Sequence, residues 1–291
     1  MTARVLIIAG SDSGGGAGIQ ADIKTVTMLG GHAMTAVTAI TAQNTLGVQA
    51  VHQIPTDMVL AQIDSVVSDI GIDAVKIGMI GSAETAHAVA SYLESLSPLP
   101  EREGPGVGRP LGKRDTGPKP THPQPLPSRE GSKLPIIFDP VMIATSGSVL
   151  ANRDTIAAFT RLMQIATLVT PNLPELAALG GEAAIRALGP AVLIKGGHAE
   201  GPSVTDRLVT NAGETHWTNP RIETRHAHGT GCTLASGIAT GLAQGLPLGA
   251  AIERAIAFVR AALANAPGLG AGHGPMGHAL GVSPFDQLRT R

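Results

Sequence analysis

The chain has 291 residues, a formal net charge of −1 and 43% hydrophobic residues, which suits one large globular domain with a well-filled core. The near-zero charge gives no reason to expect nucleic acid or a membrane as partner, and 2% aromatic residues leave few stacking platforms for single strands. A single cysteine, Cys232, excludes an internal disulfide, and the apolar run after Met1 is too short for a signal peptide or a membrane span. We therefore expect a cytoplasmic protein.

The first third of the chain predicts alternating strands and helices. Residues 4–9 form a continuous apolar run, which is typical of a strand covered on both faces. A glycine-rich loop over residues 10–18 and a helix over 19–29 follow, and together with the strand they begin a β-α-β unit. We then expect strands at 33–41 and 74–79 and helices at 56–70 and 82–96, with Thr56 as the N-cap of the helix at 56–70.

Residues 100–133 interrupt this alternation. They are dense in proline, glycine, arginine and lysine, so they cannot bury enough apolar surface to offset their ordering entropy. We predict a disordered insertion in a surface connection of a single domain spanning 1–291, and a proline-rich partner motif is the alternative. The pattern resumes with strands at 135–141, 166–170 and 191–195, a helix at 152–163, a hairpin of 207–210 with 214–218, and helices at 233–243 and 248–264.

Polar side chains gather just past the ends of the predicted strands. They are Asp139, Asn172, Glu175, Lys195 and His198. The carboxyl ends of parallel strands share one edge of a sheet, and ligands bind at that edge. Phosphoryl transfer needs carboxylates that hold Mg²⁺ and a cation near the phosphates, which these residues supply. Each carboxylate alone could instead be a helix cap or a solvated charge, and Glu175 stands at the start of a helix.

Residues 228–235 carry a second candidate site. Gly229 and Gly231 allow a tight turn, and a helix beginning there directs unpaired N–H groups and its positive dipole end towards an anion. The alternative is a glycine loop before a core helix, with Cys232 as a small apolar residue. The loop at 10–18 is neither a Walker A motif nor a dinucleotide fingerprint. The histidines are interpreted as hydrogen-bonding side chains, because no HExxH or cysteine pair accompanies His198, His226 and His228.

Eight short motifs occur together in a fixed order. By this pattern the chain resembles the ribokinase superfamily, and within it the hydroxymethylpyrimidine and phosphomethylpyrimidine kinases of thiamine biosynthesis. The motifs are Gly-Ser-Asp-Ser at 10–13, Ala-Gly-Ile-Gln-Ala-Asp-Ile-Lys-Thr at 17–25, Thr-Ala-Gln-Asn-Thr at 41–45, Lys-Ile-Gly-Met at 76–79, Asp-Pro-Val-Met at 139–142, Thr-Pro-Asn-Leu-Pro-Glu at 170–175, Lys-Gly-Gly-His at 195–198 and His-Gly-Thr-Gly-Cys-Thr at 228–233.

The resemblance implies a three-layer α/β/α sandwich with a mostly parallel central sheet. It implies phosphorylation by ATP and Mg²⁺ of 4-amino-5-hydroxymethyl-2-methylpyrimidine and of its monophosphate, and it implies a homodimer. Residues matching the pyrimidine site are Gly10, Asp22, Gln43, Met79 and Val141. Residues matching the nucleotide site are Asp139, Asn172, Glu175, Lys195 and Thr230, of which Asp139 and Glu175 would hold the metal. The catalytic anion hole would be Gly229, Thr230, Gly231 and Cys232.

Cys232 stands where sugar kinases of the superfamily carry an aspartate base. A helix N-terminus lowers a thiol pKa, so we expect Cys232 to act as a thiolate base, or else as a structural member of the anion hole. Two other functions stay open. One is a pyridoxal kinase, and the other is a non-catalytic nucleotide-binding relative, which the short connection at 176–194 would favour.

Overall fold

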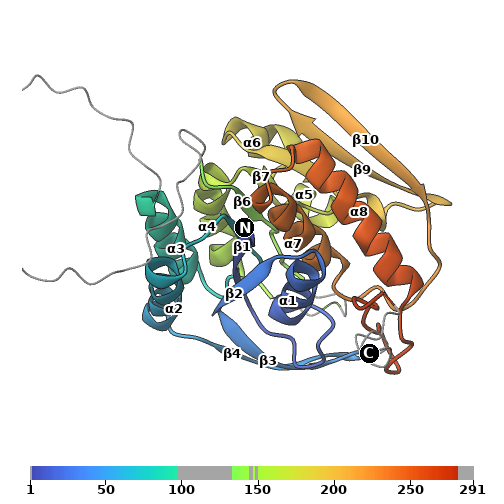
Figure 1. Cartoon of the computed structure of the whole chain (residues 1–291), viewed down its shortest axis with the longest axis horizontal. Helices are drawn as coiled ribbons and strands as arrows, with labels where there is room; N and C mark the ends of the chain where they lie inside the picture. The colour runs from blue at the N-terminus through green and yellow to red at the C-terminus, as the bar shows by residue number, and fades with distance from the viewer. Residues whose placement is uncertain (1, 97–132, 144–146, 148–149, 281–291) are drawn as a thin grey trace, which may run out of the picture.

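A computed structural model describes residues 2–96, 133–143, 147 and 150–280, so nearly all of the predicted insertion lies outside the described residues. An eight-stranded sheet in the order β10-β9-β8-β7-β6-β5-β1-β2 forms the centre of the molecule (Figure 1). Strands β2, β1, β5, β6, β7 and β8 run parallel, and the hairpin of β9 and β10 is antiparallel at one edge. The strands are β1 (Arg4–Ala9), β2 (His32–Val37), β5 (Ala74–Ile77), β6 (Ile136–Phe138), β7 (Leu168–Val169), β8 (Ala191–Ile194), β9 (Ser203–Thr210) and β10 (Gly213–Pro220).

Helices cover both faces of the sheet, which gives the expected three layers. One layer contains α2 (Thr56–Asp69), α3 (Ala83–Leu96) and α4 (Arg153–Ile165), and the other contains α1 (Gly18–Met28), α7 (Thr230–Ala243) and α8 (Leu248–Ala264). Two short helices, α5 (Leu173–Ala178) and α6 (Glu182–Ala187), fill the connection between β7 and β8, and a 3₁₀ turn, η1 (Gly196–His198), follows β8. No helix in the described part of the chain is long and apolar enough to cross a membrane.

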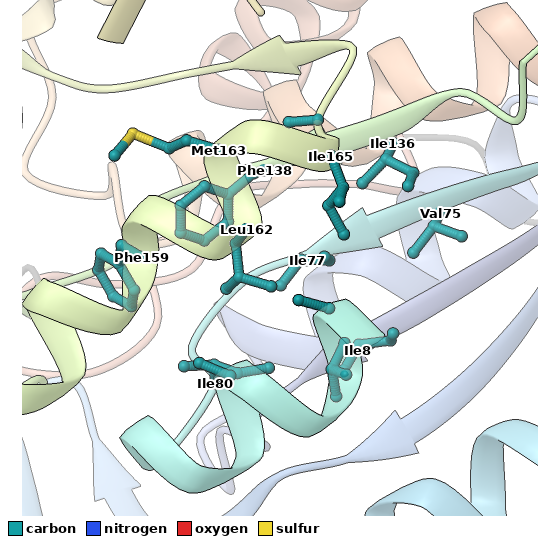
Figure 2. Packing of buried hydrophobic residues seen from close by; sticks show 14 of the residues in the cluster. Ile8, Val75, Ile77, Ile80, Ile136, Phe138, Phe159, Leu162, Met163 and Ile165 are labelled. Atoms are coloured by element: carbon teal, nitrogen blue, oxygen red, sulfur yellow. The ribbon is translucent and has the colours of Figure 1, made fainter. Parts of the chain in front are cut away.

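Strand β1 shows why the apolar runs predict central strands. Its side chains alternate between two buried clusters, with Leu6 and Ile8 on the side of α2, α3 and α4 and Val5 and Ile7 on the side of α7 and α8. Figure 2 shows the first cluster, in which strand residues lie against the inner face of α4. The rings of Phe138 and Phe159 meet edge to face there, with centroids 5.1 Å apart.

The structure corrects the prediction for residues 33–41 in one respect. They belong to two strands, because the chain leaves the sheet after β2 and forms β3 (Ala39–Asn44), which pairs antiparallel with β4 (Gly47–Gln53) in a separate two-stranded sheet. Thr38 lies at the break, where its hydroxyl donates to the carbonyl of Met79 over 2.6 Å. The strand-forming residues continue across the break, so their pattern did not reveal it.

The predicted N-cap of α2 was also wrong. Pro55 occupies that position, and the hydroxyl of Thr56 contacts the hydroxyl of Thr85 at 2.9 Å instead. The helix at 152–163 is confirmed as α4, and its N-cap is Asn152, whose side chain accepts from the N–H of Thr155.

Candidate active site

A cavity of about 780 Å³ lies at the carboxyl ends of the parallel strands, which is a usual size for a small-molecule site. The topology explains its position, because β1, β5, β6, β7 and β8 all end at this edge. Nearly all of the predicted site residues line it together: Gly10, Gln43, Met79, Asp139, Val141, Asn172, Glu175, Lys195, Gly229, Thr230, Gly231 and Cys232.

The N-terminus of α7 forms an anion site in the wall of this cavity. Gly229 precedes the helix with φ of 89°, and a Cβ atom there would lie 1.9 Å from the carbonyl oxygen of Gly16. Only glycine meets both conditions. Within the described residues, the N–H groups of Gly231 and Cys232 form no hydrogen bond. These two donors and the positive helix end are therefore available to a negatively charged ligand.

Lys195 lies beside the anion site and joins the two acidic residues predicted near the phosphates. Its ammonium is 2.7 Å from Asp139 and 3.6 Å from Glu175. A Cβ atom on Gly231 would lie 3.3 Å from the same ammonium, so the cation borders the anion loop directly. Burial lowers the pKa of Lys195, but Asp139 and Glu175 outweigh burial and raise it, so Lys195 is charged.

The pKa values of the two carboxylates shift in opposite directions. Burial raises the pKa of Asp139, but Lys195 and Lys76 outweigh burial and hold it below its usual range. Burial raises the pKa of Glu175, and the nearby charge of Asp139 adds to the effect. Glu175 also forms a capping box at the start of α5, because Asn172 accepts from its N–H over 2.9 Å and its carboxylate accepts from the N–H of Asn172 over 2.8 Å. Glu175 thus combines the helix-cap role with a position on the cavity wall.

These donors suit a hard divalent cation. Mg²⁺ in nucleotide sites is held by one or two carboxylates and takes its other ligands from phosphates and water. Asp139 and Glu175 supply two carboxylates on the cavity wall. The described residues contain no group of three His, Cys, Asp or Glu side chains arranged for a metal, so a bound ion would need the phosphate oxygens as well.

Asp22 differs from its predicted role, because it does not line the cavity. Its side chain is fully buried behind the wall, where its carboxylate accepts from the Lys76 ammonium over 2.8 and 3.0 Å and from the Ser236 hydroxyl over 2.7 Å. Lys76 is the residue of this pair that reaches the cavity, and sequence reasoning missed it. The available signal was a lysine inside an otherwise apolar strand.

The charge state of Cys232 is opposite to the prediction. Burial raises the pKa of Cys232 to about 11, and the opposing effects of Lys76 and of a backbone hydrogen bond from Gly18 do not overcome it. Cys232 is therefore a thiol at neutral pH in this structure. Desolvation of the sulfur outweighs the helix N-terminus here.

A second hydrogen-bond network connects three loops at one end of the cavity. The Nε2 atom of His228 is 3.0 Å from Asp12 and 3.1 Å from the amide nitrogen of Gln43. Asp12 also accepts from the N–H groups of Gly14, Gly16 and Ala17, so it organises the first glycine loop. This confirms the interpretation of His228 as a hydrogen-bonding side chain. His198 lies on the cavity wall and is exposed.

Another part of the cavity wall comes from β9, β10 and α8. Val204, Ile256, Val259 and Leu263 line it, together with the polar side chains of Asp206, Asn219 and Arg221. Figure 1 shows α8 running beside α7. Sequence reasoning missed these residues, because no motif marks them and only the packing of the hairpin near α8 brings them together.

Comparison with known proteins gives a consistent result. Residues 12–100 and 128–277 match a family model described as phosphomethylpyrimidine kinase, and the unmatched stretch between them falls inside the predicted insertion. A hydroxymethylpyrimidine/phosphomethylpyrimidine kinase from Streptomyces coelicolor is 42% identical over 95% of this chain and 95% of its own length.

Solved structures agree with the sequence relatives. A phosphomethylpyrimidine kinase from Clostridium difficile 630 is 32% identical with a TM-score of 0.67, covering 89% of this chain and 98% of its own. A pyridoxal kinase from Staphylococcus aureus in complex with AMP-PCP is 29% identical with a TM-score of 0.76, covering 96% of this chain and 94% of its own.

Proposed function

Since this chain belongs to the phosphomethylpyrimidine kinase family, we propose that it transfers the γ-phosphoryl group of ATP to 4-amino-5-hydroxymethyl-2-methylpyrimidine and then to the resulting monophosphate, for thiamine biosynthesis. One observation carries the proposal. The unpaired N–H groups at the start of α7 face the cavity beside the Lys195 ammonium, which is the environment that a transferring phosphoryl group needs.

Some residues of the site stabilise negative charge on the phosphoryl group, and others hold these residues in position. The N–H groups of Gly231 and Cys232 donate to the negative charge that develops on the transferring group, and the Lys195 ammonium stabilises the same charge. Asp139 and Glu175 would hold Mg²⁺, which supplies further neutralisation of phosphate charge when it is bound. Asn172 keeps Glu175 in place through the capping box.

Gln43, Met79, Gly10 and Val141 line the end of the cavity that we assign to the pyrimidine. The N–H of Cys232 belongs to the anion site and the residue lines the same cavity, and we assign its thiol to the acceptor oxygen. A hydroxymethyl acceptor must lose a proton, whereas a phosphate monoester is already anionic, so Cys232 matters more for the first transfer.

Two alternatives are weaker. The pyridoxal kinase from Staphylococcus aureus has a similar structure at 29% identity, but the curated relative with 42% identity is named for the pyrimidine substrates. A non-catalytic relative was suggested by the short connection at 176–194. This connection contains part of α5 and all of α6, and Ile185 is fully buried in the core, so the short segment is well packed.

The proposal is tested by measuring ADP release with three acceptors supplied separately. We expect turnover with hydroxymethylpyrimidine and with its monophosphate, ending in the diphosphate. Turnover with pyridoxal alone would move the function to vitamin B6 salvage. ATP binding without turnover of any acceptor would support the non-catalytic alternative.

We further propose a homodimer in the cytoplasm. Ile40 on β3 supports the homodimer, because this large apolar side chain is 52% exposed on the open two-stranded sheet, where a second copy would cover it. Light scattering on the purified protein tests the assembly, and Ile40→Lys should shift a dimer towards the monomer.

A further inference from the structure

Gln43 is aimed into the cavity by an irregularity of its strand. The pairing register of β3 and β4 shifts between Ala42 and Gln43, which re-aims the side chain relative to a regular strand. The hydroxyl of Ser13 fixes the backbone there, since it accepts from the N–H of Gln43 and donates to its carbonyl, both over 2.8 Å. The amide group of Gln43 then lies between His228 on one side and Thr41 on the other.

The partner on the His228 side is a donor. Nε2 of His228 faces the carboxylate of Asp12 at 3.0 Å. Burial raises the pKa of Asp12, but hydrogen bonds from His228, Ala17 and Gly14 outweigh burial and lower it, so Asp12 is an ionised acceptor. The Nε2 atom therefore carries a hydrogen, whatever the charge of the ring. The Gln43 atom placed at 3.1 Å from His228 is the amide nitrogen, which is a donor and cannot pair with this N–H. A half-turn of the amide places Oε1 there instead, where it accepts from the Nε2–H that His228 shares with Asp12.

The partner on the Thr41 side is an acceptor. The hydroxyl hydrogen of Thr41 is used by the carbonyl of Ser11, over 2.9 Å, and the contact to Gln43 is longer at 3.4 Å. A hydroxyl has only one hydrogen, so the oxygen of Thr41 can only accept from Gln43. Both neighbours thus require the same orientation of the amide, with Oε1 towards His228 and Nε2 towards Thr41. The alternative, related by half a turn of the amide, pairs donor with donor and acceptor with acceptor.

We infer that His228, held by Asp12, and Thr41 lock the amide of Gln43 in this one orientation, and that the lock sets which substrate ring the enzyme accepts. Each amide atom keeps one further hydrogen-bonding position, a lone pair on Oε1 and an N–H on Nε2. A locked amide pairs with a ring edge that presents a donor beside an acceptor in one order only. His228, Asp12 and Thr41 are positioning residues, because they act through Gln43.

This inference rests on the proposed function, which supplies such an edge. In the aminopyrimidine, the 4-amino group donates and the neighbouring ring nitrogen accepts. In the 4-oxo analogue the order is reversed, because the oxygen accepts and the ring N–H donates. An amide that is free to turn suits both compounds equally, whereas a locked amide leaves polar groups unpaired with the analogue.

The experiment compares kcat/KM for the two compounds in the wild type, His228→Phe and Thr41→Val. The phenylalanine keeps a ring but removes the donor, and the valine keeps the branched shape but removes the oxygen. His87→Phe, on the exposed surface of α3, is the matched control. We expect the wild type to prefer the amino compound by at least about 100-fold. Both lock variants should reduce this preference at least about tenfold, mainly through KM, and His87→Phe should leave it unchanged.

The outcomes distinguish failure of the lock from failure of the proposed function. If both variants lose the same factor on both compounds, so that the preference stays constant, the residues only support the fold and the lock is refuted. If the wild type phosphorylates neither pyrimidine, the proposed function itself fails and the lock fails with it. Thr41→Val provides the decision if His228→Phe does not fold, because it acts on the opposite end of the same amide.

Discussion

The pH dependence of the two phosphorylations tests the role of Cys232. If the thiolate is the base, the rate on the hydroxymethyl acceptor follows the ionised fraction of Cys232. Burial raises the pKa of this thiol to about 11. The thiolate is the deprotonated form, so its fraction rises about tenfold for each pH unit below that value. Between pH 7 and pH 9 the first phosphorylation should therefore accelerate by about 100-fold.

The second phosphorylation provides an internal reference. A phosphate monoester has a second pKa of about 6, so the acceptor is already a dianion at pH 7 and needs no base. Its rate should stay flat over the same range. Cys232→Ala should remove the pH dependence of the first reaction and slow it by about 100-fold to 10,000-fold, which is the usual contribution of a general base.

The assay is ADP release at saturating ATP, measured between pH 7 and pH 9 with each acceptor. Cys232→Ser serves as a matched variant, because a hydroxyl fills nearly the same space and does not ionise in this range. A flat profile for the wild type on the hydroxymethyl compound would refute the thiolate base. Equal losses on both acceptors in Cys232→Ala would leave Cys232 as a structural member of the anion site.

Three further substitutions test the packing around the site. Gly229→Ala places a Cβ atom 1.9 Å from the carbonyl of Gly16, so it should abolish turnover and lower the melting temperature. Gly249→Ala, in the first turn of α8, meets nothing within 4 Å and should raise the free energy of unfolding by roughly 0.4–1 kcal/mol in urea titrations without changing turnover. Lys76→Met leaves the buried carboxylate of Asp22 without its cation and should cost about 3–5 kcal/mol of unfolding free energy, whereas the double variant with Asp22→Leu should recover part of the loss.

The cavity that holds the candidate site lies where the sequence predicted, because topology determines its position. Asp139, Glu175 and Lys195 each follow a strand or a strand-end turn, and a parallel sheet brings all such positions to one edge. The helix start at Gly229 was visible in the sequence as well, because glycines precede an apolar helical pattern there. The local sequence pattern was sufficient to locate residues that lie at the ends of strands and helices.

Asp22 and Lys76 show where this reasoning stops. Both side chains are fully buried and form an ion pair between α1 and β5, and of the two only Lys76 lines the cavity. The sequence pattern predicted the helix of Asp22 and the strand of Lys76. Each of these charged residues interrupts an otherwise apolar face of its element. Nothing in the local sequence says that the two charges meet, because the contact depends on the packing of α1 on the sheet. The role assigned to Asp22 came from resemblance, and the geometry gives the cavity-facing position to Lys76 instead.

The network of Asp12 and His228 is harder still to predict, because 216 positions separate the two residues. Each lies in a loop whose path is fixed by glycines rather than by hydrophobic periodicity. The close approach of Gly229 to Gly16 brings these two loops together, and this contact belongs to the anion site. His228, which we propose to orient Gln43, also directly precedes Gly229 in the sequence, where the anion site begins.

Cys232 illustrates a competition that a sequence cannot resolve. The helix N-terminus and the nearby Lys76 favour the thiolate, whereas desolvation and the carboxylates of Asp22 and Asp139 oppose it. Sequence gives the first effect, since the helix start is visible, but the desolvation of the sulfur depends on how closely the surrounding loops pack. The high pKa also has a functional consequence. A thiol that ionises reluctantly is a strong base once it is ionised, which suits the proton of an alcohol and leaves an anionic phosphate acceptor unaffected.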